Sequence, residues 1–114
     1  MGDNTIVTKK QIIYYTTSNG KCPYLEWVSS LDNKTQSIIK ARIDRLKDGL
    51  MGDWKHLTNS KLSELRINYG KGYRVYYREL NNIIILIVAG GDKSNQQRLI
   101  KQASNYLQEL EERT

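Results

Sequence analysis

The sequence predicts a single α+β domain in which a mostly antiparallel sheet is combined with a helical hairpin and a C-terminal helix. Two stretches within 62–78 alternate apolar and polar residues with a period of two, which is typical of strands with one buried face. A third stretch, 83–89, is apolar throughout, as expected for a central strand covered on both sides. Apolar residues recur at helical spacing in 34–49 and 99–110. The expected order of elements is therefore β-α-α-β-β-β-α.

Length and composition fit one folded domain. We expect it to span residues 1–114, with its core at about 9–110, because a chain of this length forms one hydrophobic core but not two. The chain is 39% hydrophobic and 26% charged, which distinguishes it from a disordered protein. Its longest apolar run is far shorter than the roughly 20 residues of a transmembrane helix. The first residues also lack the pattern of a secretory signal, so the expected location is the cytoplasm, with no membrane contact.

The N-terminal half predicts a strand and two helices. Residues 1–8 are expected to form a short lead-in, and 9–17 is a strand because it is rich in β-branched and aromatic residues. Pro23 suits the first turn of a short helix. Asn33 and Gln36 resemble a capping box at the start of the second helix. These two helices form the predicted hairpin.

A loop at 54–61 is expected to lead into two strands joined at 70–72. Glycines at both ends of this connection permit the positive φ angles that a tight reversal requires. The alternation of polarity directs one set of side chains into the core and the other set to the opposite face. Four residues are expected to share that face, which would be basic with one aromatic ring between the charges: Arg66, Arg74, Tyr76 and Arg78.

The Gly-Gly-Asp-Lys-Ser segment at 90–94 is expected to be a turn that opens the last helix. Ser94 and Gln97 have the spacing of a capping pair for that helix. The free N–H groups at a helix start, together with Lys93, are suited to binding a phosphate group. Glycine turns before helices are also common without any ligand.

The charge of the chain fits a polyanionic partner. The formal net charge is +6 and the isoelectric point is about 9.5, and basic residues outnumber acidic ones most strongly within 61–101. Such a surface binds nucleic acid or merely keeps a protein soluble, and net charge alone does not separate these alternatives. Cys22 and His56 are the single cysteine and the single histidine, too few for a disulfide or a typical zinc site, so we expect no metal and no cofactor.

Several motifs together resemble those of a known family. In chain order they are ARIDRL at 41–46, GLMGD at 49–53, ELR at 64–66, GKGYRVYY at 70–77 and GGDKS at 90–94. This ordered set resembles the phage-derived, HigB-like addiction-module killer proteins of the RelE/ParE toxin superfamily. The similarity covers roughly 12–110, and the ordered set is more specific than any one motif.

The resemblance implies a small RelE-like toxin of a bacterial type II toxin–antitoxin module. Members of this kind are usually ribosome-dependent endoribonucleases, or mRNA interferases, which inhibit translation by cutting mRNA in the decoding site. The implied partners are a helix-turn-helix antitoxin, HigA-like in type, and the ribosome with its mRNA. Metal-independent cleavage uses the RNA 2′-hydroxyl as an internal nucleophile, so the protein must orient it and stabilise charge on phosphorus.

Carried over position by position, the resemblance implies catalytic roles for Arg66, Arg74 and Lys93. Both arginines are suited to binding phosphate oxygens, and the lysine to neutralising charge near the leaving group. Tyr76 would stack on a base or relay a proton. Further RNA contacts are expected from Lys71, Arg78, Ser94 and Arg98, with Arg78 alternatively solvated or in contact with the antitoxin.

The acid and base are left open among Asp92, Glu64 and His56. Leu99 stands about where RelE-type nucleases often place a tyrosine, and HigB toxins that rely on histidines have more than this chain's one. Glu64 has an alternative role as an ion-pair partner of Arg66, and Asp92 as a cap at the helix start. Two other functions remain in competition with the nuclease: a ParE-like gyrase inhibitor, and a non-catalytic module that binds antitoxin or RNA.

Overall fold

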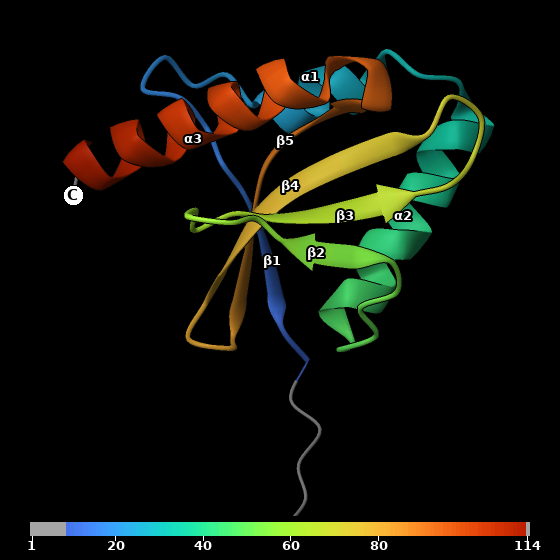
Figure 1. Ribbon diagram of the computed structural model, residues 1–114, viewed down its shortest axis with the longest axis horizontal. Coiled ribbons are helices and arrows are strands. Elements are labelled where there is room, and N and C mark those ends of the chain that lie inside the picture. Colours follow the sequence, from blue (N-terminus) through green and yellow to red (C-terminus); the bar gives the residue numbers. More distant parts are fainter. Residues whose placement is uncertain (1–8, 114) are drawn as a thin grey trace, which may run out of the picture.

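A five-stranded mixed sheet with helices on both faces forms the protein (Figure 1). The computed structural model describes residues 9–113, so the predicted lead-in at 1–8 lies outside the described residues. In chain order the elements are β1 (Gln11–Tyr14), α1 (Pro23–Ser29), α2 (Asn33–Lys47), β2 (Trp54–His56), β3 (Ser63–Ile67), β4 (Tyr73–Leu80), β5 (Ile84–Asp92), a 3₁₀ turn (Lys93–Asn95) and α3 (Gln96–Arg113). The predicted α+β class is confirmed. Within residues 9–113, every helix is too short or too polar to cross a lipid bilayer.

The strand order is β1-β5-β4-β3-β2, which makes β1 and β2 the two edges of the sheet. The pairs β2–β3, β3–β4 and β4–β5 are antiparallel, which confirms a mostly antiparallel sheet. Strand β1 instead pairs in parallel with β5, the last strand of the chain. Parallel strands cannot be joined by a tight turn, and here α1, α2, β2, β3 and β4 lie between them in the sequence.

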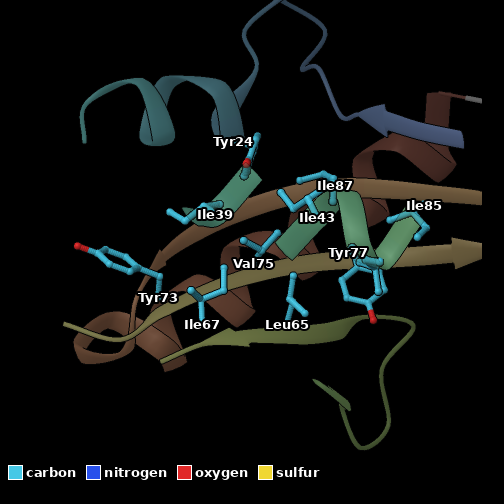
Figure 2. Close-up of a cluster of buried hydrophobic side chains, with 11 residues drawn as sticks. Tyr24, Ile39, Ile43, Leu65, Ile67, Tyr73, Val75, Tyr77, Ile85 and Ile87 are labelled. Atoms are coloured by element: carbon cyan, nitrogen blue, oxygen red, sulfur yellow. The ribbon is translucent and has the colours of Figure 1, made fainter. Parts of the chain in front are cut away.

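Two hydrophobic cores lie on opposite faces of the sheet. The first joins α1 and α2 to β3, β4 and β5, and its members include Tyr24, Ile39, Ile43, Leu65, Val75, Tyr77, Ile85 and Ile87 (Figure 2). The second lies under α3 and includes Tyr15, Leu62, Tyr76, Leu86, Val88, Leu99, Ala103 and Leu107. The fully apolar run of β5 supplies side chains to both cores. This confirms the prediction of a strand covered on both sides.

The prediction of an open basic face was wrong for Tyr76. Strand alternation does place Tyr76 opposite the first core, but α3 packs across this face and leaves the ring 0% exposed. Tyr76 and Tyr77 are adjacent in β4, so strand alternation buries one ring in each core. At this point Tyr76 pairs with Ala89 and Tyr77 with Ile87, which leaves Val88 as an extra residue in β5. An amphipathic last helix was predicted from the sequence, but alternation within a strand does not say which face that helix covers.

The predicted turn at 90–94 was also wrong, because β5 continues through both glycines to Asp92. A Cβ atom on Gly90 would lie 2.3 Å from the Trp27 ring on one face, and a Cβ on Gly91 would lie 2.3 Å from Leu99 Cδ1 on the other. Both residues are glycine because α1 and α3 approach the strand backbone directly. They allow close packing from both sides rather than a reversal of the chain.

The predicted helix caps were wrong, because other residues cap both helices. The N-cap of α2 is Asp32, whose carboxylate accepts from Thr35 N at 2.7 Å, rather than Asn33. Before α3, Asp92 accepts from Ser94 N at 2.9 Å, which replaces the predicted pair of Ser94 and Gln97. Asp92 thus fulfils the alternative role of a cap at the helix start.

The predicted loop at 54–61 was wrong in its first part, where Trp54–His56 forms the edge strand β2. Three residues are too few to show a period in the sequence. Pairing with β3 supplies the hydrogen bonds that such a short strand cannot make alone.

We expect Gly90→Ala and Gly91→Ala each to lower the free energy of unfolding by about 1–3 kcal/mol, because the added methyl overlaps Trp27 or Leu99. Urea denaturation followed by tryptophan fluorescence measures this. Ser104→Ala, at an exposed position of α3, is the matched control and should change stability little. Full stability of both glycine variants would contradict the packing described here.

Candidate functional site

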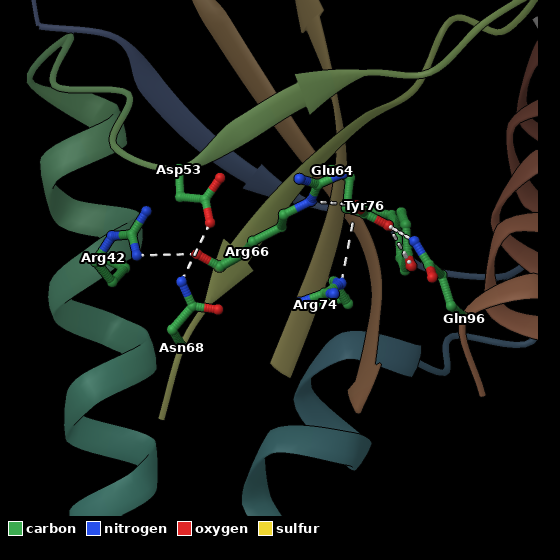
Figure 3. A network of polar contacts seen from close by, with 8 residues as sticks. All are labelled: Arg42, Asp53, Glu64, Arg66, Asn68, Arg74, Tyr76 and Gln96. Atoms are coloured by element: carbon green, nitrogen blue, oxygen red, sulfur yellow. Dashed lines mark hydrogen bonds and ion pairs between the residues drawn. The ribbon is translucent and has the colours of Figure 1, made fainter. Parts of the chain in front are cut away.

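A buried carboxylate, Glu64, lies at the centre of a polar network on the α3 face of the sheet (Figure 3). Its Oε1 accepts a hydrogen bond from Arg66 Nε at 2.9 Å. Its Oε2 accepts from Tyr76 OH at 2.9 Å and from Gln96 Nε2 at 2.7 Å. Arg74 Nε lies 3.8 Å from Oε1 and adds a second positive charge. The predicted ion pair between Glu64 and Arg66 is therefore confirmed.

The strand register brings these residues together. Glu64 pairs with Tyr76 and Arg66 pairs with Arg74 across β3 and β4. Because side chains two apart in a strand share a face, the two cross-strand pairs lie side by side on the α3 face. The first residue of α3, Gln96, reaches the same carboxylate from the helix. Two strands and one helix thus meet at one acidic group.

The pKa of Glu64 is lowered by its neighbours. Burial alone would raise this pKa, but hydrogen bonds from Arg66, Gln96 and Tyr76, together with the charge of Arg74, outweigh it. The carboxylate is consequently ionised at neutral pH, which balances part of the positive charge of the two arginines. A group in this state, 0% exposed and with its oxygens already hydrogen-bonded, is suited to orienting the arginines.

Tyr76 is a neutral hydrogen-bond donor in this network. Burial first, and then the negative charge of Glu64, raise the pKa of its hydroxyl well above the ordinary range. The ring is enclosed by the second core and is not open for stacking on a nucleobase. Its predicted placement as an exposed aromatic between the arginines is therefore corrected.

A hollow of about 250 Å³ opens beside this network, at the turn between β3 and β4. Arg74 and Lys93 bring positive charge to it, and the other lining residues belong to the turn: Asn68, Tyr69, Gly70 and Gly72. The backbone N–H of Lys93 donates to the carbonyl of Gly72 at 2.8 Å. Gly72 has a φ of +79°, and a Cβ there would meet the lysine stem at 3.1 Å. The glycine therefore lets Lys93 cross the turn and reach the hollow.

Arg42 from α2 supports the strand that carries Arg66. Its Nη1 donates to the Arg66 carbonyl at 3.0 Å, from the side of the sheet opposite α3. The Arg66 N–H donates to the carbonyl of Asp53 at 2.8 Å, and the Asp53 carboxylate accepts from Asn68 Nδ2 at 3.2 Å. Gly52 leaves room for the guanidinium, because a Cβ there would lie 2.4 Å from Arg42 Nη2. The backbone of Arg66 is thus held at its carbonyl by Arg42 and at its N–H by Asp53.

The structure brings only some of the predicted site residues together. Arg66, Arg74, Tyr76 and Glu64 form the network, and Lys93 lies at the adjoining hollow. Lys71 and Asp92 are sequence neighbours of residues that line the hollow, and the Ser94 hydroxyl is hydrogen-bonded to the Asp92 carboxylate. Hydrogen bonds from Ser94, which outweigh partial desolvation, together with the charge of Lys71, lower the pKa of Asp92.

Three predicted residues lie away from the network. Arg78 pairs with Glu111 of α3 at 3.3 Å, so it ties β4 to the helix. His56 is exposed on β2, and its Nδ1 lies 3.2 Å from Ser63 Oγ, at the other end of β3 from the hollow. Arg98 is exposed in the first turns of α3.

Sequence reasoning missed Gln96 and Arg42 as parts of this site. Gln96 is the neighbour of Gln97, which was assigned to a cap, and no local pattern marks which glutamine reaches back to the sheet. Arg42 lies within the ARIDRL segment at 41–46, off the apolar stripe of its helix, where a charged residue is usually solvated. Both residues act across elements distant in sequence, so only their meeting in space reveals them.

Comparison with known proteins finds a relative of uncharacterized function. The chain is 46% identical over 85 residues to an uncharacterized protein of Haemophilus influenzae. The aligned part is 74% of this chain and 85% of that protein. No protein-family model matches the chain.

We expect Glu64→Gln to lower the free energy of unfolding by roughly 1–3 kcal/mol at pH 7, because the two arginines lose their buried counter-charge. The folded-state pKa of Glu64 is below its unfolded value of about 4.3, so its contribution is complete above that value. It is lost as the pH falls through the lower folded-state pKa. The difference between wild type and variant should therefore shrink in acid.

Urea denaturation at a series of pH values measures this difference. Glu26→Gln, at an exposed position of α1, makes the same chemical change outside the network and serves as the control. A constant difference between wild type and Glu64→Gln down to strongly acidic pH would contradict the ionised, buried state of this carboxylate.

Proposed function

The chain belongs to the same family as this uncharacterized Haemophilus influenzae protein, and from its own residues we propose that it is a toxin of a type II toxin–antitoxin module. Its proposed activity is the ribosome-dependent cleavage of mRNA, which stops translation. The ordered motifs that resemble HigB-like killer proteins are the sequence support. The finer, RelE-like description of the fold belongs to this proposal, as does a helix-turn-helix antitoxin as partner.

The observation that carries the proposal is the pairing of two arginines above one buried carboxylate. Arg66 and Arg74 are register partners on adjacent strands. Glu64 accepts a hydrogen bond from Arg66 Nε and attracts Arg74 by charge, with Arg74 Nε 3.8 Å from its Oε1. Guanidinium groups fixed in this way present N–H donors to phosphate oxygens without the entropy cost of ordering them during the reaction. Lys93, at the rim of the adjoining hollow, adds a third positive charge.

The proposed reaction is attack by the RNA 2′-hydroxyl on the adjacent phosphorus. The new bond joins the 2′-oxygen to phosphorus, the bond from phosphorus to the 5′-oxygen breaks, and the products are a cyclic phosphate and a 5′-hydroxyl. The two arginines stabilise the negative charge that builds up on the phosphoryl oxygens. Lys93 stabilises the negative charge on the departing 5′-oxygen, which becomes the 5′-hydroxyl by taking a proton from water.

A residue that takes or gives a proton in this reaction must be accessible to the RNA. This requirement separates the three candidates for the acid and base. Glu64 is 0% exposed and fully engaged, so we assign it a positioning role. Asp92 is only half-buried and directly precedes Lys93, which lines the hollow. Its Oδ1 accepts from Ser94, so its Oδ2 is the atom that we propose takes the proton. His56 lies at the other end of β3. We therefore propose Asp92 first, with a group of the ribosome as the alternative.

We expect Lys93→Ala and Arg74→Ala each to reduce cleavage of translated mRNA by about 100-fold, as does removal of a charge-stabilising donor from other enzymes. Primer extension on mRNA from a bacterium that expresses the protein measures this, with growth as a second readout. Arg74→Lys keeps the charge but loses the fork of donors, and should give intermediate activity. Arg45→Ala, at an exposed position of α2, is the matched control and should retain toxicity.

Each of the competing functions gives a different result in this experiment. Growth arrest with intact translated mRNA would contradict the nuclease. Induction of the DNA-damage response in place of translation arrest would instead indicate a gyrase inhibitor. A protein without toxicity, or with toxicity unchanged by Lys93→Ala and Arg74→Ala, would indicate a module that only binds its antitoxin or RNA.

A further inference from the structure

A second hollow, of about 290 Å³, lies at the free edge of the sheet, where the β2 side chains meet the turn between β4 and β5. Trp54 and His56 of β2 line it, with Lys61, Ser63, Asn81 and Asn82. We propose that this hollow is a nucleobase subsite in which the Trp54 indole stacks on one base of a single-stranded RNA. The inference rests on the proposed function, because it extends the RNA contact beyond the cleavage site.

The exposure of Trp54 is the first observation. The side chain is 42% exposed on a three-residue edge strand, although its register partner, Leu65, is fully buried. A tryptophan that only filled the core would be covered by a neighbouring strand or helix. Here β2 is the last strand of the sheet, so part of the indole face is open to an incoming ring.

The chemistry of the lining selects a nucleobase over an apolar protein segment. Around the Trp54 ring the hollow presents polar groups: the His56 imidazole with the Ser63 hydroxyl hydrogen-bonded to its Nδ1, the carboxamides of Asn81 and Asn82, and the Lys61 ammonium, which is also paired with Glu111. A base needs a π-face for stacking and hydrogen-bonding groups at its edges, which this lining offers. An apolar anchor of a protein partner would leave those polar groups without water or partners. Glu79, the acidic group of the lining, is in an ion pair with Lys10.

Trp54 is directly connected to the arginine site. The residue before it, Asp53, accepts from the Arg66 N–H and from Asn68, and Asn68 lines the first hollow. Trp54 and Arg66 lie on adjacent strands, about 4.8 Å apart, but their side chains project from opposite faces of the sheet, so the RNA must pass around the β2 edge over more than one nucleotide. Lys55, between Trp54 and His56, is exposed and lies opposite Glu64 in register, on the face of the arginines. An RNA strand held at Arg66 would thus pass the Lys55 ammonium as it rounds the edge to the indole.

The test uses a short single-stranded 2′-O-methyl RNA, which lacks the attacking hydroxyl and stays intact. The protein contains two tryptophans, and Trp54→Phe leaves Trp27 alone as the fluorophore. We expect the RNA to quench fluorescence of the wild type but not of Trp54→Phe. Trp54→Ala should bind about 10-fold more weakly, the loss typical of one base–aromatic stack.

Tyr14→Ala is the matched control, because Tyr14 is an aromatic side chain of similar exposure, 40%, on the opposite edge strand. Its RNA affinity should equal that of the wild type, and circular dichroism verifies that each variant is folded. Quenching that persists in Trp54→Phe, or an unchanged affinity of Trp54→Ala, would overturn the subsite. So would a wild-type protein that does not bind this RNA.

Failure of the subsite is distinguishable from failure of the proposed function. Cleavage of translated mRNA in cells tests the function without reference to Trp54. A protein that cleaves mRNA but shows none of the tryptophan effects would be a nuclease without this subsite. Absence of cleavage in cells would refute the premise itself.

Discussion

The constraint on which the site depends is the burial of a charged carboxylate in the middle of a sheet. Glu64 is 0% exposed, and an ionised group in that position is stable only when donors and opposite charges replace the lost water. β4 supplies Arg74 and Tyr76, β3 itself supplies Arg66, and α3 supplies Gln96. The hydrogen bond that helps to satisfy the carboxylate also holds Arg66 in place, whereas Arg74 is attracted by charge alone across 3.8 Å.

Helix α3 buries one part of the polar network and leaves the other part partly exposed. It covers part of one sheet face through Leu99, Ala103 and Leu107, and it encloses Tyr76 in the second core. Next to the first residue of α3, Gln96, the helix covers the sheet less completely. There the side chains of Arg66 and Arg74 are 33% and 14% exposed. The boundary between the buried and open parts of the face therefore sets where the proposed phosphate contact would lie. Gly91 makes that boundary possible, because Leu99 packs directly on its backbone.

The basic residues of the sequence divide into two groups in the structure. Some serve the fold: Arg78 and Lys61 bind Glu111 near the end of α3, and Arg42 holds the Arg66 carbonyl. Arg74 and Lys93 instead border a hollow, so these two positive charges lie together at one place on the surface. Net charge alone could not separate these roles, since ion pairs and phosphate contacts use the same side chains.

The sequence by itself determined the class of fold, the strand alternation and the placement of Arg66 and Arg74 on one face, because a period of two is a local property of the chain. It also narrowed the candidates for the proposed acid and base to a few residues. Only the tertiary structure decided that Tyr76 is buried, that β5 runs through Gly90 and Gly91, and that Gln96 and Arg42 support the site. The physical reason is that burial and hydrogen-bond partners depend on which helix packs on which face, and that choice joins residues far apart in the chain.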